Sequence, residues 1–227
     1  TARRALIERV GSFRSRMPAG VTLCAVVKAR SPDEITAALE AGVKVLGASY
    51  AQETQRLSHG VRTLLGRPPD AAWRFIGHLQ SNKVRDLLPL VDTVDTVDRV
   101  KLAAALDKRA AELGRMLPVL IEVNSGKEPQ KSGVLPEAVL GFATELAGFT
   151  HLRIEGVMTM GPEGHAGDGL RPYFALTKNC FEALAGLRQE NLQPKVLSMG
   201  MSDSWEAALA EGANLVRIGT ALFGPRL

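Results

Sequence analysis

The lysine at position 28 is the residue with the clearest potential for covalent chemistry. It follows the apolar run Val21–Val27, which is typical of a buried strand, and it precedes a turn and helix start at Ser31–Glu34. Burial favours the neutral amine of a lysine, and a neutral amine forms a Schiff base with an aldehyde. In the ordinary alternative, the ammonium group of Lys28 simply reaches solvent at the strand end.

Two glycine-containing turns near the end of the sequence are suited to binding an anion. They read Ser198-Met199-Gly200-Met201-Ser202-Asp203 and Arg217-Ile218-Gly219-Thr220-Ala221. We expect Gly200 to let the backbone approach a ligand closely and Ser202 to cap the next helix. Gly219 and Thr220 offer N–H groups and a hydroxyl. Each turn alone is an ordinary turn with a helix cap, but the two together with Lys28 indicate a ligand that carries a phosphate.

A reactive lysine and a phosphate site together indicate pyridoxal 5′-phosphate (PLP). Lys28 would bond the aldehyde, and Arg217 is the candidate partner of the ring nitrogen, a place that arginine or aspartate commonly occupies. An aspartate would keep that nitrogen protonated and make a strong electron sink. An arginine only donates hydrogen bonds, so the nitrogen stays unprotonated and the sink is weaker. The alternative role of Arg217 is a salt bridge, for which Glu155 is the candidate partner.

Eight apolar segments are expected to form the strands that position these residues. They are Val21–Lys28, Val43–Gly47, Trp73–Ile76, Asp92–Val97, Pro118–Asn124, Arg153–Thr159, Val196–Met199 and Leu215–Gly219. Helical patterns precede and separate them, at Ala2–Ser15, Ser31–Ala41, Ala51–Leu65, Gln80–Leu88, Asp98–Leu113, Pro136–Ala147, Leu170–Leu187 and Ser202–Glu211. The strands are apolar throughout rather than alternating, which is typical of a parallel sheet covered on both faces.

This order of elements predicts an α/β fold, a single (β/α)8 TIM barrel that spans residues 1–227 as one domain. An open, doubly wound sheet is the main competitor. In a barrel of this kind the active face is built from the C-terminal ends of the strands, and phosphate often binds after strands seven and eight. Lys28, the Ser198–Asp203 turn and the Arg217–Ala221 turn all fall at such ends.

The composition excludes several other classes of protein. Hydrophobic residues make up 45% and charged residues 23%, as in an ordinary globular chain. The net charge of +4 is scattered and aromatic residues are only 5%, so no nucleic-acid partner is indicated. Cys24 and Cys180 lack the spacing of a zinc site or a disulfide framework. There is no apolar run long enough to cross a bilayer and no signal peptide, so we expect a cytoplasmic protein without a membrane partner.

Several stretches of the chain have distinctive residue sequences. They are Ala25–Lys28, Phe75–Lys83, Val123–Gly126 with Lys131–Gly133, Gly156–Met160, Leu197–Ser202 and Val216–Gly224. At these residues the chain resembles the PLP homeostasis proteins, the YggS/PROSC family, whose fold is similar to the N-terminal barrel of alanine racemase. The resemblance covers nearly the whole chain, and the stretch Ile76–Lys83 is its most specific part.

The resemblance implies that Lys28 holds PLP covalently, that Arg217 faces the ring nitrogen and that Met158 packs near the ring. The residues implied to surround the phosphate are Ser198, Met199, Gly200, Ser202, Gly219 and Thr220. His78 lies in the distinctive stretch, either as a group at the rim or as a structural histidine. The chain departs from the family after the second strand, where Gly47-Ala48-Ser49-Tyr50 replaces the usual Gly-Glu-Asn-Tyr. Ser49 would then contact the cofactor over a shorter reach or through water.

The function that the resemblance implies is PLP homeostasis, in which the chain carries or buffers PLP reversibly without robust catalysis. PLP-dependent apo-enzymes are the candidate recipients, and a monomer is expected. An alternative is a racemase-like PLP enzyme, with Lys28 as one base and a rim residue or partner chain as the other. Racemases of this fold take a tyrosine from a second domain, whereas the tyrosines here are Tyr50 and Tyr173. A third hypothesis is a phosphosugar-type barrel enzyme in which Lys28 bonds the substrate.

Overall fold

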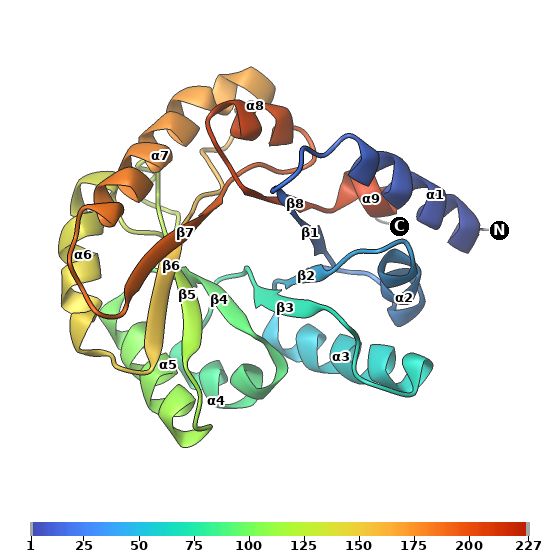
Figure 1. The fold of residues 1–227 in the computed structure, drawn as a ribbon, viewed down its shortest axis with the longest axis horizontal. Helices are drawn as coiled ribbons and strands as arrows, with labels where there is room; N and C mark the ends of the chain where they lie inside the picture. The colour runs from blue at the N-terminus through green and yellow to red at the C-terminus, as the bar shows by residue number, and fades with distance from the viewer. Residues whose placement is uncertain (1, 226–227) are drawn as a thin grey trace.

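Eight parallel strands close into a barrel, and helices surround it on the outside (Figure 1). The structure, a computed structural model, describes residues 2–225. Its strands are β1 (Thr22–Val26), β2 (Val45–Ala48), β3 (Ala72–Phe75), β4 (Thr93–Val97), β5 (Leu117–Glu122), β6 (Leu152–Met158), β7 (Leu192–Ser198) and β8 (Leu215–Ile218). They pair in sequence order, and β1 closes the barrel on β8, with Cys24 opposite Arg217. The predicted (β/α)8 barrel is confirmed, and the open sheet is wrong.

Two strand boundaries differ from the prediction in ways that matter for the site. Strand β1 ends at Val26, so Lys28 lies two residues beyond it, in a turn. Strand β7 begins at Leu192 rather than Val196. Its first half is partly exposed and carries Gln193, Pro194 and Lys195, so a search for apolar runs does not find it.

The helices follow the strands in the expected order. They are α1 (Ala2–Ser15), α2 (Pro32–Glu40), α3 (Ala51–Leu65), α4 (Val84–Leu87), α5 (Val100–Glu112), α6 (Val139–Glu145), α7 (Arg171–Ala185), α8 (Trp205–Ala210) and α9 (Thr220–Phe223). The single helix predicted over Gln80–Leu88 is wrong, because 3₁₀ turns at Ser81–Lys83 and Leu88–Leu90 flank a short α4. The short α9 was not predicted at all.

The sequence predicts a capping residue before both α2 and α8. Ser31 caps α2 in a capping box with Glu34, as its sequence indicates. The residue at the N-cap of α8 is Ser204, so the prediction that Ser202 caps this helix is wrong. The hydroxyl of Ser202 instead accepts a hydrogen bond from the N–H of Ala221 in α9, at 3.2 Å. Ser202 therefore links the turn after β7 to the helix after β8.

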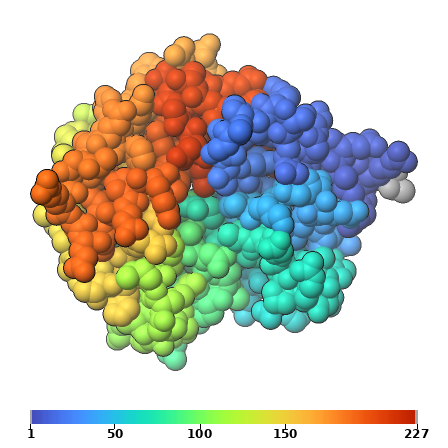
Figure 2. Space-filling model, in the orientation of Figure 1, coloured from blue at the N-terminus to red at the C-terminus, as the bar shows by residue number. Residues whose placement is uncertain are grey.

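The hydrophobic core lies mainly between the strands and the outer helices. Large side chains there are fully buried, among them Ile35, Leu46, Leu57, Leu106 and Phe174. The space-filling view shows the N-terminal segment, in blue, against the C-terminal segment, in red (Figure 2). Helix α1 packs on α2 and α9 there. Within residues 2–225, every helix is too short or too polar to span a membrane.

Candidate functional site

The inside of the barrel carries a buried ion pair below the strand ends. Arg74 on β3 donates two hydrogen bonds of 2.8 Å to the carboxylate of Asp95 on β4. Asp95 is fully buried, so the pair is shielded from water. Cys24 on β1 faces the same charges, and burial raises the pKa of its thiol to about 12. A thiol of that pKa stays protonated and inert, so Cys24 is a packing residue.

Arg217 lies above this pair on β8 and is almost completely buried. Its two terminal nitrogens donate to the Ser198 hydroxyl at 2.6 Å and to the Thr159 carbonyl at 2.7 Å. Burial lowers the pKa of its guanidinium, which nevertheless stays charged. The alternative role as a salt-bridge partner of Glu155 is wrong, because Glu155 pairs with Arg153 and Lys195 instead.

A groove of about 540 Å³ opens over Arg217 at the ends of β7 and β8. It is lined by Val26, Met201, Ser202, Asp203, Arg217, Gly219, Thr220 and Ala221. The two turns that the sequence suggested for an anion therefore come together, joined by the Ser202–Ala221 hydrogen bond. Hydroxyls, backbone N–H groups and a buried cation form a donor set that suits a phosphate group.

Two predicted phosphate residues are placed differently by the structure. The Met199 side chain is fully buried in the core, and its N–H donates to the Leu215 carbonyl at 3.1 Å. Gly200 has a φ of +91°, and a Cβ there would lie 2.6 Å from the Cβ of Ala208. Packing of the turn on α8 therefore requires a glycine at this position. The Gly200 carbonyl accepts a hydrogen bond from the N–H of Arg217. Met199 and Gly200 therefore support the residues that line the groove.

Lys28 is not among the lining residues of this groove and lies in a tight turn two residues after Val26, which is one of them. The next residue, Ala29, has a φ of +57°, and its N–H donates to the Glu53 carboxylate at 2.8 Å. Glu53 on α3 thus fixes a turn that an L-residue does not readily adopt. Lys28 is half-buried, and its ammonium lies 4.9 Å from the centre of the Tyr50 ring. Tyr50 therefore faces Lys28 rather than serving only as a helix start.

The altered stretch after β2 is packed tightly against the loop after β3. Ala48 is buried in the core at the end of β2, so a longer charged side chain has no room there in this packing. The carbonyl of Ser49 would overlap with any Cβ at Gly77, which explains the glycine at the start of the distinctive stretch. The Ser49 side chain is half-buried beside Tyr50.

Met158 is buried at the end of β6, opposite Ser198 on β7.

A second cavity, of about 400 Å³, adjoins the groove and shares Met201 with it. It lies between the loops that follow β3, β5 and β6, and His78, Glu122, Asn124, Lys131, Thr159 and His165 are among its lining residues. His78 Nδ1 lies 2.9 Å from the Ser132 hydroxyl and ties the β3 loop to the β5 loop. This hydrogen bond gives His78 a structural role at the rim.

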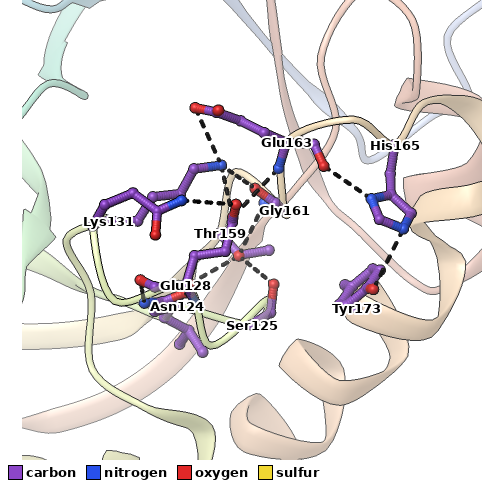
Figure 3. A network of polar contacts seen from close by, with 11 residues as sticks. Asn124, Ser125, Glu128, Lys131, Thr159, Gly161, Glu163, His165 and Tyr173 are labelled. Carbon is purple, nitrogen blue, oxygen red and sulfur yellow. Dashed lines mark hydrogen bonds and ion pairs between the residues drawn. The ribbon is translucent and has the colours of Figure 1, made fainter.

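The loops after β5 and β6 are held together by a network of polar contacts (Figure 3). Lys131 pairs with Glu128 at 2.9 Å and donates to the Gly161 carbonyl at 3.2 Å. Ser125 and Thr159 share a hydroxyl–hydroxyl hydrogen bond of 2.9 Å, and Thr159 also donates to the Val123 carbonyl. Because the Thr159 carbonyl accepts from Arg217, the network reaches the floor of the groove.

Sequence reasoning missed three residues of this site: Glu53, Thr159 and Glu122. Glu53 and Thr159 act through hydrogen bonds to residues far away in the sequence, which no local pattern indicates. Glu122 had a visible signal, because it is the charged residue in the otherwise apolar segment Leu117–Val123. Its Oε2 atom is buried and has no hydrogen-bond partner among the described residues. Burial and the charge of Asp98 raise the pKa of Glu122 to about 7, against the opposing effects of Arg217 and Arg99.

Comparisons with known proteins agree with this fold. The family model for the alanine racemase N-terminal domain matches residues 2–226. A pyridoxal phosphate homeostasis protein of Aquifex aeolicus is 35% identical over 97% of this chain and 95% of its own length. The protein of that name in Escherichia coli K12 is 38% identical over 93% and 88%. The chain therefore belongs to the alanine racemase N-terminal domain family and, within it, to the pyridoxal phosphate homeostasis proteins.

Solved structures give the same result. PipY of Synechococcus elongatus PCC7942, in a structure without PLP, is 34% identical, with a TM-score of 0.88 over 96% of this chain and 100% of PipY. In its structure with PLP bound, the TM-score is 0.81 at 32% identity, with the same coverage. An alanine racemase of Clostridium difficile shares the fold at 17% identity and a TM-score of 0.66, and this chain covers 55% of it. The family predicted from the sequence motifs is thus confirmed.

Proposed function

We propose that this chain binds PLP reversibly and carries or buffers it, as a PLP homeostasis protein without robust turnover. The observation that carries the proposal is the buried guanidinium of Arg217 at the floor of a groove lined by Ser202, Gly219 and Thr220. Relatives over nearly the whole chain bear the name pyridoxal phosphate homeostasis protein, and PipY has a structure with PLP bound. The donor set of this groove fits such a ligand.

The residues of the site divide the tasks of binding among them. Lys28 supplies the amine for the cofactor aldehyde from the turn that Glu53 holds. Ser202, Gly219 and Thr220 bind the phosphate, with Ser198, Met199 and Gly200 supporting them. Met158 lies at the strand end beside Ser198, near the ring. Ser49, beside Tyr50, completes the site in place of the family's asparagine.

Arg217 determines what the bound cofactor can do. PLP, when bound, offers an aldehyde that reacts with amines and a ring that withdraws electrons. Arg217 donates to Ser198 and Thr159 and remains charged, so it can only donate to the ring nitrogen. It thereby keeps a proton off that nitrogen and weakens electron withdrawal. This favours storage and transfer over proton abstraction from a substrate.

The first test is spectroscopic. Titration of the protein with PLP should produce the visible absorbance band of a lysine-bound cofactor, and borohydride should fix the cofactor to the peptide that contains Lys28. A Lys28→Ala variant should lose the band. Lys44→Ala is the matched control, because Lys44 is exposed and pairs with Asp70 at the N-terminal ends of β2 and β3, opposite the site, and it should keep the band. Protein that gains no band at any PLP concentration would refute both PLP hypotheses and favour a phosphosugar-type barrel.

A second test separates a carrier from a racemase-like enzyme. Loaded protein is incubated in deuterated buffer with L- and D-amino acids, and exchange of the α-proton is followed by NMR. A carrier shows little exchange, whereas rapid exchange that requires Lys28 would support the enzyme. When a PLP-dependent apo-enzyme is added, the activity of that enzyme should then be restored while the absorbance band of the loaded protein decreases.

We further propose that the chain acts as a monomer in the cytoplasm, where its two free, buried cysteines stay reduced.

A further inference from the structure

Glu122 is a carboxyl group at the mouth of the barrel that no part of the proposed function uses. It is the last residue of β5 and lies opposite Met158 of β6. It lines the cavity of about 400 Å³ that adjoins the groove over Arg217. Its Oε2 atom is buried and makes no hydrogen bond to any residue within 2–225. A buried carboxylate oxygen without a partner is costly, and protonation removes that cost.

The cations near Glu122 are already committed to other groups. Arg99, in the segment after β4, donates to Asp98 and to the Leu79 carbonyl, each at 2.5 Å. Arg217 donates to Ser198 and Thr159. Asp98 adds a negative charge close enough to Glu122 to disfavour its ionisation. The balance of burial and these charges raises the pKa of Glu122 to about 7.

The other titratable groups of the cavity lie on the loops around it. They are His78 after β3, Lys131 after β5, and Glu163 and His165 after β6. Lys131 is paired with Glu128, and His165 Nδ1 lies 3.0 Å from the Glu163 carbonyl. His78 is bonded to Ser132. Glu122 therefore differs from them in lacking a fixed partner, and its charge state is the one that a ligand can change most easily.

We propose that Glu122 is a positioning residue that couples PLP binding to the uptake of a proton at its own carboxyl group. This inference rests on the proposed function of the site. An ionised Glu122 competes with an anionic cofactor for the positive field of Arg217, and a neutral Glu122 does not. Binding of the anion therefore favours the protonated carboxyl group. By linkage, PLP affinity falls as Glu122 ionises, at most about tenfold for each pH unit.

The test compares wild-type protein with a Glu122→Gln variant, which keeps the shape and removes the charge. PLP dissociation constants are measured across about pH 6 to 9, together with binding heats in two buffers of different ionisation enthalpy. We expect the two proteins to bind alike at the acidic end, while wild type loses affinity more steeply above neutrality and takes up more protons. All other groups are the same in the two proteins, so the difference isolates Glu122. Equal slopes and equal proton uptake would overturn the proposal.

A second measurement needs no cofactor and no variant. Infrared difference spectra of the wild-type protein between acidic and alkaline buffer should show the carbonyl stretch of a protonated carboxyl group that disappears around pH 7. Absence of that band at the acidic end means that Glu122 is already ionised and overturns the inference. In the binding experiment, His78→Asn and His165→Asn variants serve as controls and should keep the wild-type dependence of PLP affinity on pH. If PLP gives no absorbance band with any variant, the proposed function fails; a band with equal slopes refutes only the role of Glu122.

Discussion

Arg217 and Glu122 are groups of opposite charge type at the same end of the barrel, and they do not pair with each other. Arg217 is satisfied by a hydroxyl and a carbonyl, both neutral, and keeps its charge. Glu122 lacks a partner for Oε2 and is held near neutrality by burial. Direct pairing would cancel the positive field that an anionic ligand needs. The separation of the two groups therefore preserves that field for an incoming ligand.

The raised pKa of Glu122 also predicts how stability depends on pH. Its pKa of about 7 in the folded protein lies above the ordinary value of 4.5, so the folded state binds the proton more tightly. Ionisation of Glu122 therefore lowers the free energy of unfolding. The loss grows as the pH rises from 4.5 to about 7 and reaches its full size above pH 7. It amounts to about 3 kcal/mol. Urea unfolding should find Glu122→Gln more stable than wild type at alkaline pH and nearly equal at acidic pH. A constant difference across this range would contradict the assignment.

At the scale of elements, the turn after β1 depends on one contact from α3. The Glu53 carboxylate accepts the N–H of Ala29, whose φ of +57° is unfavourable for an L-residue. Glu53→Ala should destabilise the protein by about 1.5–3 kcal/mol, speed hydrogen exchange at the Ala29 amide and weaken formation of the PLP band. Glu53→Gln keeps an acceptor oxygen and is the control, with most of the protection retained. Unchanged exchange at Ala29 in Glu53→Ala would show that the turn is held by other contacts.

The elements were largely predictable, but the orientation of residues at their ends was not. Apolar runs and glycine stops identify eight strands, because burial on both faces leaves a strong signal. Side chains alternate between faces of a strand, so a small error at its end reverses the expected direction. Met199 is expected at the phosphate and packs in the core instead, and Gly200 serves the packing of α8. Lys28 is found two residues past β1.

At the scale of the whole molecule, the ion pair inside the barrel joins β3 to β4 beneath the site. Removing one partner of a buried pair leaves a charge without compensation, so Asp95→Asn should destabilise the protein by about 3–5 kcal/mol in urea unfolding. Glu206→Gln is the comparison, because Glu206 pairs with Arg16 on the surface, where such a bond contributes about 0–1 kcal/mol. Similar losses in the two variants would mean that water reaches the interior pair.

The seam between β1 and β8 also sets when the site can exist during synthesis. Cys24 on β1 pairs with Arg217 on β8, and the groove takes Val26 from one side of the seam and Gly219 from the other. A nascent chain still attached to the ribosome with β8 inside the exit tunnel has Lys28 but neither the guanidinium nor the Thr220 hydroxyl. Such a chain presents an unshielded lysine and no phosphate site. Cofactor capture therefore has to follow the release of β8, so the cofactor cannot assist the folding of the earlier strands.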